Sequence, residues 1–329
     1  MMGRRRKHRK DLPERVYFKH GSYFFVRRDG GWTNLGKDYV RAMTRYASIN
    51  DVGALNTMGA VMDAFIAQEL PKKAERTKRE YLQQIKRLRA VFGQMRPDQI
   101  RPTDIYSYMD LRPAVAANRE KSLLSAILSF AIRKGLCSDN PCRLVKRNTE
   151  TPRDRYVQDW EFIAVRNIAP PPVQCAMDIA KLTGLRLGDI MTLRLQNVRD
   201  DGLHVQTRKT GKKMIFELTP KLLDVIARAK ALGSAKEGKK QTKVRALTLI
   251  VSRSGHGYTL DGFSSIWQRV MVKAIEEKLI EERFTFHDLR AKAGSESADA
   301  QNLLGHDDPR TTNRVYRRLP RRVKPVDDT

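Results

Sequence analysis

The chain has 329 residues, of which 64 are Lys or Arg and 37 are Asp or Glu, so its formal net charge is +27. A chain of this length is expected to form two or three domains, and so large a positive excess indicates a polyanionic partner, with nucleic acid favoured over a membrane surface. The sequence has no long apolar span, and no apolar stretch follows its basic N-terminus, which argues against a membrane protein and against a secretory signal. We therefore expect a cytoplasmic protein that binds nucleic acid.

The cysteines indicate neither disulfides nor a metal site. Cys137, Cys142 and Cys175 form no Cys-x-x-Cys motif and no cluster with histidines. We expect them to be small, buried or partly buried residues. The chain also contains no P-loop and no DxD cluster, so the sequence predicts no metal and no cofactor.

Residues 1–55 begin with a basic arm that is too charged to fold without DNA. The arm residues expected to bind DNA are Arg4, Arg5, Arg6, Lys7, Arg9 and Lys10. The runs VYFKH, SYFFVRR and WTNLG follow, separated by glycines, and this pattern is typical of a three-stranded meander. Asp38 is placed to cap a helix that continues to about Ser48.

Residues 56–147 have apolar side chains at helical spacing, which predicts a helical bundle. We expect Thr103 to cap a short helix within it and Gly135 to end its last long helix. Basic residues lie between the apolar stripes, and in a chain this basic we favour phosphate contact over a role in solubility alone. These residues are Lys72, Lys73, Arg76, Lys78, Arg79, Lys86, Arg87 and Arg89.

A polar, basic linker spans 142–154, and a second globular region follows from about Tyr156. The domain that contains this region is assigned to residues 148–329. Alternating apolar residues at 203–207 and 214–218 predict a β-hairpin with a lysine-bearing turn, and 247–251 predicts one more strand. Residues 233–245 are rich in Lys and Gly and are expected to form a loop. The predicted fold class is multidomain and mainly α, with a small three-stranded N-terminal β-sheet domain, a helical bundle and a mixed α+β domain.

This last region also contains the groups that a metal-free cleavage of a phosphodiester requires: cations for the extra negative charge, a nucleophile and an acid for the leaving oxygen. Arg186 lies between two glycines at the end of an apolar helix. His287 and Arg290 are three residues apart and share a face if their segment is helical. His306 follows a glycine at a predicted helix end.

Tyr316 lies in a short helix that Asp308 is placed to cap and Pro309 to begin. Each of these signals alone has an ordinary structural explanation. Arg186 would be an ion-pair partner, His306 a helix-terminal cap or a satisfied core residue, and Tyr316 a half-buried aromatic.

Together the signals resemble the tyrosine recombinases, the family of the lambda-type phage integrases. The resemblance lies in the order Arg186, a hairpin lysine, His287-x-x-Arg290, Gly305-His306 and a late tyrosine, and it covers about residues 57–320. The basic arm and meander resemble the arm-site-binding domain of lambda-type integrases. The resemblance implies an arm-site DNA-binding domain at 1–55, a core-site DNA-binding domain at 56–147 and a tyrosine recombinase catalytic domain at 148–329.

The resemblance also implies roles for individual residues. Arg186 and Arg290 would hold the non-bridging oxygens of the scissile phosphate, which suits the planar, permanently charged guanidinium. His287 and His306 would add hydrogen bonds and accept the proton of the nucleophile, Tyr316, whose free pKa is about 10.

The resemblance implies that other residues protonate the leaving group and orient the site. Lys209 aligns with the lysine of the family that protonates the departing 5′ oxygen, with Lys212 and Lys213 as nearby alternatives. Asp189 matches an acidic position that orients neighbouring groups. The interval from His306 to Tyr316 is one residue longer than the commonest family pattern, and we expect the extra residue in the loop at 307–309.

The function implied is site-specific recombination through a 3′-phosphotyrosyl intermediate, integrating or excising DNA without metal or ATP. Its partners would be double-stranded DNA at core and arm attachment sites, three further copies in a homotetramer, a DNA-bending accessory protein and an excisionase, in a bacterial host. Two alternatives are a type IB topoisomerase, which uses similar chemistry to relax supercoils, and a non-catalytic basic DNA-binding protein.

Overall fold

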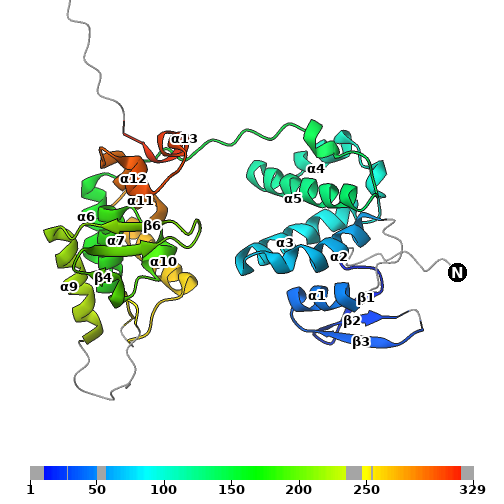
Figure 1. The fold of residues 1–329 in the computed structure, drawn as a ribbon, viewed down its shortest axis with the longest axis horizontal. Coiled ribbons are helices and arrows are strands. Elements are labelled where there is room, and N and C mark those ends of the chain that lie inside the picture. The colour runs from blue at the N-terminus through cyan, green and yellow to red at the C-terminus, as the bar shows by residue number, and fades with distance from the viewer. Residues whose placement is uncertain (1–10, 28, 50–56, 235–246, 253–254, 320–329) are drawn as a thin grey trace, which may run out of the picture. The chain divides into compact units, whose positions relative to one another are not determined.

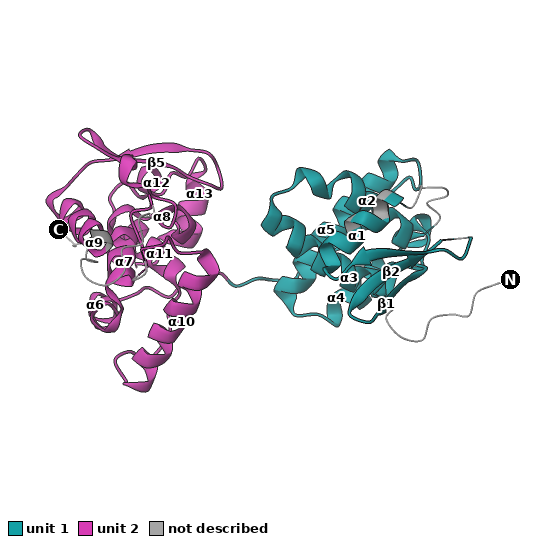
Figure 2. Ribbon diagram, turned by 90° about the horizontal axis from the view of Figure 1, so that it is seen from below, with its two compact units in different colours: residues 1–151 teal, residues 152–329 magenta. Residues whose placement is uncertain are grey.

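The computed structural model describes residues 11–27, 29–49, 57–234, 247–252 and 255–319. The chain divides into two compact units, residues 1–151 and residues 152–329 (Figures 1 and 2). The finer division of the first unit at residue 55 remains a prediction.

Unit 1 begins with the three-stranded meander that the sequence predicts. Strands β1 (Val16–Lys19), β2 (Ser22–Val26) and β3 (Trp32–Gly36) pair antiparallel in the order β1-β2-β3. Helix α1 (Tyr39–Ile49) follows, and the Asp38 carboxylate accepts the backbone N–H of Arg41 at 2.9 Å, so the predicted cap is confirmed.

The rest of unit 1 is a helical bundle, as predicted. Its helices are α2 (Met58–Gln68), α3 (Glu75–Phe92), α4 (Pro102–Asp110) and α5 (Ala114–Arg133), with short 3₁₀ turns at Leu70–Lys72, Pro97–Gln99 and Pro141–Leu144. Their apolar faces form one core with the sheet and α1. Gly135 follows α5 with a φ of +70°, which confirms the predicted stop.

The prediction that Thr103 caps a helix is wrong by two residues. Helix α4 begins at Pro102, so Arg101 is the N-cap, and the Asp104 carboxylate accepts the Arg101 backbone N–H at 2.8 Å. Proline suits the first position of a helix because its missing N–H has no partner there in any case.

Unit 2 contains a helical core beside a small sheet (Figure 1). Its helices are α6 (Asp159–Ile168), α7 (Pro171–Thr183), α8 (Leu187–Ile190), α9 (Pro220–Ser234), α10 (Leu260–Glu276), α11 (Phe286–Glu296), α12 (Ala300–Leu304) and α13 (Pro309–Thr311), with a 3₁₀ turn at Leu195–Asn197. Buried helix α7 packs against α6, α9 and α11.

The sheet confirms the predicted hairpin. Strands β5 (Gly202–Gln206) and β6 (Lys213–Phe216) are antiparallel, and the two-residue strand β4 (Val198–Arg199), too short to give a sequence pattern, adds to β5. The strand predicted at 247–251 is wrong, because only the isolated bridges Arg194↔Thr248 and Val251↔Gly257 form there. Of the loop predicted at 233–245, residues 235–246 lie outside the described residues.

The predicted fold class is confirmed: a small N-terminal sheet, a helical bundle and a mixed α+β unit. The cysteines are buried at Cys142 and Cys175 and partly buried at Cys137, as expected. Among the described residues, every helix is too short or too polar to span a bilayer.

Candidate active site

Helix α11 provides two of the predicted site residues. Thr285 is its N-cap, and the Asp288 carboxylate accepts the Thr285 backbone N–H at 2.7 Å, which fixes where the helix begins. His287 and Arg290 lie three residues apart on this helix, as predicted, with the histidine exposed and the arginine only 2% exposed.

The Arg290 guanidinium is held by uncharged acceptors. Nη1 donates to the carbonyl of Gly184, and Nη2 donates to the carbonyl of Leu304 at 2.6 Å and to Nε2 of His306 at 3.0 Å. Burial and the neighbouring charge of Arg186 lower the pKa of Arg290. The site therefore contains a buried cation whose charge these acceptors leave uncompensated.

Arg186 joins this group at the turn between two helices. Helix α7 ends at Gly184, whose φ of +63° reverses the chain, and Arg186 is the half-buried N-cap of α8. The charge of Arg186 is among the causes that lower the pKa of His287, Arg290 and His306, so it acts electrostatically on all three.

His306 follows Gly305, the left-handed residue that ends α12 with a φ of +61°. Its Nε2 accepts from Arg290, so its Nδ1 carries the proton and donates to Oγ1 of Thr312 at 2.8 Å. Burial, with the charges of Arg290 and Arg186, lowers the pKa of His306 to about 4. This imidazole is neutral at pH 7.

Tyr316 lies at the end of the short helix that the sequence predicts. The Asp308 carboxylate caps α13 by accepting the Arg310 backbone N–H at 2.8 Å, Pro309 is its first residue, and the chain continues into the π-helical turn η5 (Thr312–Tyr316). The placement of the extra residue at 307–309 remains a prediction. The π-helical turn, which contains one residue more than an α-helical turn, is a second place for it.

The side chain of Tyr316 points into the group formed by α11 and His306. Its hydroxyl is 3.3 Å from Nε2 of His287, and its ring centroid is 4.8 Å from that of His306 and 5.3 Å from the Arg290 guanidinium. Although part of the His287 side chain is exposed, the atoms packed around its ring exclude water from it and, with the charge of Arg290, lower its pKa, so its neutral Nε2 is available as an acceptor for the tyrosine proton.

The hairpin lysines lie in different environments. Lys209 is exposed in the turn between β5 and β6, and Lys213 is exposed at the start of β6. Lys212 is half-buried, and its Nζ is 2.9 Å from Oδ1 of Asp307, the residue after His306. Of the three, Lys212 is therefore the one in contact with the segment of the site histidine.

Asp189 is hydrogen-bonded to the turn of the hairpin. Its side chain is 3% exposed, and Oδ1 accepts the backbone N–H of Arg208 at 2.9 Å. This contact fixes the backbone immediately before Lys209.

The predicted DNA-binding residues belong to unit 1. The arm residues Arg4, Arg5, Arg6, Lys7, Arg9 and Lys10 lie outside the described residues. On α3, Arg76 and Arg79 are exposed, while Lys78 and Lys86 are half-buried; three of these four pair with carboxylates, namely Arg76 with Glu80, Lys78 with Glu75 and Lys86 with Asp11.

Two of the basic residues expected to contact phosphate have another role. Arg89 is 6% exposed and forms a buried ion pair with Asp63, so the prediction of phosphate contact is wrong for it. Arg87 donates to the buried carboxylate of Glu120 at 3.1 Å. A helical stripe of basic residues does not distinguish side chains that face solvent from those that face an acid across the bundle.

The sequence did not point to several residues that support the site. Thr312 orients His306, while Asp288, Ser295 and Arg318 bond to one another or to the backbone of Tyr316. The one available signal was Asp288, which stands three residues after Thr285 as in a capping box. The contacts of Ser295 and Arg318 join segments that are distant in sequence, and Thr312 stands six residues after His306 without a recognisable motif.

Comparisons with known proteins agree with this site. The model of the phage integrase family matches residues 162–321. The integrase of Escherichia phage lambda is 28% identical over 93% of this chain and 94% of its own length, and that of Escherichia phage HK022 is 26% identical over 66% and 69%.

Solved structures agree in fold. A lambda integrase dimer bound to a COC' core site superposes with a TM-score of 0.66 at 21% identity, over 99% of this chain and 100% of that one. A lambda integrase tetramer bound to a Holliday junction gives a TM-score of 0.62 at 22% identity, over 91% and 97%. The comparisons favour neither the topoisomerase nor the non-catalytic binding protein. The chain thus resembles the lambda-type phage integrases over nearly its whole length, and it is a site-specific DNA recombinase of the tyrosine type.

Proposed function

We propose that Tyr316 is the nucleophile of this recombinase. Its hydroxyl oxygen attacks the scissile phosphorus, the bond to the 5′ oxygen breaks, and a 3′-phosphotyrosyl bond and a free 5′-hydroxyl result. The observation that carries this proposal is the position of the Tyr316 side chain. Its hydroxyl is 3.3 Å from Nε2 of His287, and its ring lies against the Arg290 guanidinium. The 5′-hydroxyl of a partner strand reverses the step and rejoins the DNA.

The two arginines are the proposed clamp for the phosphate. Arg290 is buried with a lowered pKa and bonded to uncharged acceptors, so an arriving phosphate supplies the charge that it lacks. Arg186, whose charge acts on Arg290, would hold a second non-bridging oxygen. The neutral His287 is the proposed acceptor for the tyrosine proton, and His306, bonded to Arg290, orients the clamp.

Lys209 is the proposed acid for the leaving 5′ oxygen, because it matches the lysine of the family in position. Lys212 is the alternative, and its contact with Asp307 favours it. A substrate whose 5′-bridging oxygen is replaced by sulfur separates them, because a thiolate leaves without a proton at neutral pH whereas an alkoxide needs one. We expect Lys209→Ala to cleave the oxygen substrate slowly and the sulfur substrate at the wild-type rate. That pattern in Lys212→Ala alone would transfer the role to Lys212. Asp189 is proposed to hold the turn for this step through Arg208.

The test of the nucleophile is a nicked suicide duplex in the presence of a chelator. We expect a detergent-resistant protein–DNA adduct with the wild-type protein and none with Tyr316→Phe. An adduct that persists in Tyr316→Phe, or its absence in the wild type, would show that the assignment is wrong.

Each chain carries one such tyrosine, and a full exchange requires two cuts in each of two duplexes, so we propose a homotetramer on DNA. The structural relatives bound to a core site and, as a tetramer, to a Holliday junction support this assembly. The basic α3 residues Arg76, Lys78, Arg79 and Lys86 are proposed contacts to core-site phosphates from the domain at 56–147, with catalysis in 148–329.

Residues 1–55, with the basic arm, are proposed to bind a second class of site, the arm site, so that one chain bridges two DNA segments. Such bridging requires bent DNA, which is the role proposed for an accessory protein, and an excisionase would set the direction. Because the sheet and α1 share a core with the bundle, the test replaces the arm residues Arg4, Arg5 and Arg6 by Ala, which we expect to spare cleavage of a core site and to abolish integration at a full attachment site. Since the substrate is DNA, the proposed place of action is the nucleoid in the cytoplasm of a bacterial host.

A further inference from the structure

The backbone that leaves Tyr316 is held to helix α11 through one hydroxyl group. Ser295 Oγ donates to the carbonyl of Tyr316 at 2.8 Å and accepts the backbone N–H of Arg318 at 2.8 Å. The residues that follow the nucleophile are therefore held against the same helix that carries His287 and Arg290.

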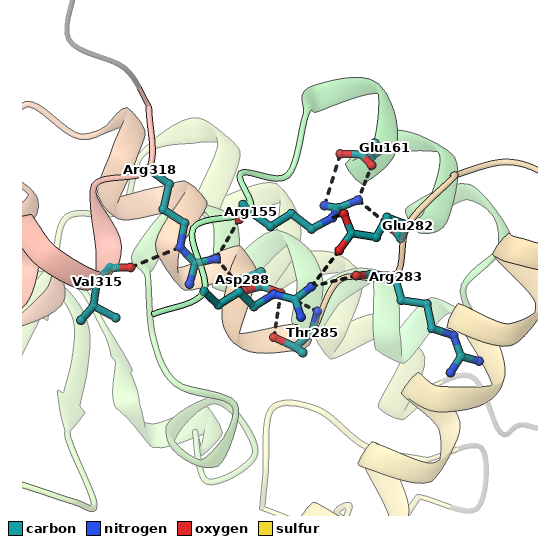
Figure 3. A network of polar contacts seen from close by, with 9 residues as sticks. Arg155, Glu161, Glu282, Arg283, Thr285, Asp288, Val315 and Arg318 are labelled. Atoms are coloured by element: carbon teal, nitrogen blue, oxygen red, sulfur yellow. Dashed lines mark hydrogen bonds and ion pairs between the residues drawn. The ribbon is translucent and has the colours of Figure 1, made fainter. Parts of the chain in front are cut away.

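The side chain of Arg318 makes a second and stronger attachment (Figure 3). It is 7% exposed, its Nη1 donates to Oδ1 of Asp288 at 2.6 Å and to the carbonyl of Arg155 at 2.8 Å, and its Nε donates to the carbonyl of Val315 at 3.2 Å. The last contact returns to the π-helical turn, one residue before the nucleophile.

Asp288 is the centre of this attachment and the immediate neighbour of His287. Its side chain is 2% exposed, and Oδ2 accepts from the backbone N–H of Thr285 at 2.7 Å and lies 3.1 Å from Nε of Arg153. Burial by itself would raise the pKa of Asp288, but the hydrogen bonds from Arg318 and Thr285 hold it below its ordinary value. The carboxylate is thus charged, and it connects the cap of α11, the chain after Tyr316 and the start of unit 2.

We propose that Arg318 and Asp288 are positioning residues for DNA cleavage. They form a latch, made of these two side chains and the carbonyls of Arg155 and Val315, that holds the Tyr316 hydroxyl at His287. This inference rests on the proposed role of Tyr316 as nucleophile and adds to it the group that sets the position of the nucleophile.

Physical reasons favour such a role over stability alone. Tyr316 ends a π-helical turn, whose last hydrogen bond, from the Arg317 N–H to the Thr312 carbonyl at 3.0 Å, lies at the exposed end of the segment. A turn of this kind has poor intrinsic stability, so anchors beyond its end decide where its last side chain points. A displacement of about 1 Å at a reacting group can cost about 10²-fold in rate.

The experiment measures how fast the adduct forms on the suicide duplex at saturating protein, together with the affinity for the same DNA. We expect Arg318→Ala to slow adduct formation by about 10²-fold, with DNA affinity within about threefold of wild type, because the latch lies at the nucleophile and not at the phosphate clamp. Arg317→Ala is the matched control: it removes the same charge one residue away, from an exposed side chain, and should form adduct at the wild-type rate.

A sulfur leaving group distinguishes positioning of the nucleophile from other defects. A misplaced tyrosine remains slow on the 5′-phosphorothiolate duplex, whereas a lost proton donor does not. We therefore expect Arg318→Ala to be equally impaired on both substrates. Full recovery on the sulfur substrate, a wild-type rate on the oxygen substrate, or a loss confined to affinity would each overturn the proposal.

Arg318→Lys gives a second measurement if the alanine variant does not fold, as judged by its thermal unfolding. Lysine keeps one charged nitrogen for Asp288 and the Arg155 carbonyl but has no counterpart of Nε to donate to the Val315 carbonyl, so we expect an intermediate rate. A lysine variant as fast as wild type would contradict the latch. If the wild-type protein forms no adduct, the assignment of Tyr316 as nucleophile is wrong. If the wild-type protein forms the adduct and the Arg318 variants form it equally fast, the latch is wrong and the assignment of Tyr316 stands.

Discussion

Two buried arginines, one in each unit, are held in opposite ways. In unit 1, Arg89 forms an ion pair with Asp63; burial by itself would lower the pKa of Arg89, but the charge and the hydrogen bonds of Asp63 together raise it. In unit 2, Arg290 donates to the carbonyls of Gly184 and Leu304, and burial together with Arg186 lowers its pKa. Both guanidiniums are less than a tenth exposed.

The difference separates a structural cation from one kept for a ligand. The charge of an arginine paired with a carboxylate is already neutralised, so it attracts a further anion only weakly. An arginine held by carbonyl dipoles has a fixed geometry and keeps its net charge. Burial alone therefore does not identify a functional arginine in this protein. The charge of its hydrogen-bond partners distinguishes an arginine that is free to bind an anion.

The largest expected effect is on stability, in unit 1. Arg89→Met leaves the buried Asp63 without its partner, and we expect the free energy of unfolding of unit 1 to fall by about 3–5 kcal/mol. Hydrogen exchange, measured peptide by peptide, reports the two units separately. The double variant Arg89→Met with Asp63→Leu should recover most of the loss; if it does not, Arg89 acts through packing and the contrast between the two arginines is weakened.

The next effect is on activity, in unit 2. Arg290→Met should slow adduct formation by about 10²–10³-fold, the cost of removing one preorganised donor to a developing charge. Its effect on stability should be smaller than that of Arg89→Met, about 1–3 kcal/mol, because it leaves only neutral carbonyls unpaired. An active Arg290→Met enzyme, or one in which unit 2 unfolds, would remove the distinction.

A glycine pair tests whether the carbonyl that holds Arg290 is constrained by packing. A Cβ at Gly184 would lie 2.7 Å from Leu304 Cδ2, on a residue with a φ of +63°, while a Cβ at Gly135 in unit 1, with a φ of +70°, would meet no atom within 4 Å. Gly184→Ala should cost about 1–3 kcal/mol more than Gly135→Ala, because both carry the left-handed strain but only Gly184 is overpacked. Equal losses of thermal stability in the two variants would show that Leu304 moves aside freely.

The last prediction concerns pH. The pKa of His306 is about 4 in the folded chain against an ordinary value near 6.5, so between these values the unfolded chain binds more protons. Unit 2 should therefore be most stable above pH 6.5 and lose stability as the pH falls toward 4. His306→Gln should flatten this dependence in a series of thermal unfolding curves, and an unchanged slope would mean that the histidine is not buried as described.

The fold was largely predictable from local patterns. The meander, the hairpin, the cap at Asp38 and the stop at Gly135 all depend on residues within one element and its turn. The errors were of two kinds. The segment at 247–251 had the right composition but forms only single bridges, to Arg194 and Gly257, and the cap at Thr103 competed with a proline one residue earlier.

The site was predictable where chemistry is confined to a short motif and not where it joins distant segments. Tyr316, His287 and Arg290 are brought together as expected, although their roles remain proposals. The partners of Arg89 and Arg318 are 26 and 30 residues away in sequence, on other elements, so no spacing rule could reveal them.

The π-helical turn that ends at Tyr316 has a consequence for how such enzymes diverge. A turn that closes over five residues in place of four takes up an inserted residue locally, so the chain before and after it need not be rebuilt. Descendants of one ancestor can then differ by a residue in this interval and still deliver the same hydroxyl to the same phosphate. An alignment that requires a fixed number of residues between the histidine and the tyrosine would overlook active members. An alignment that instead requires the residues that anchor the turn on either side would retain them.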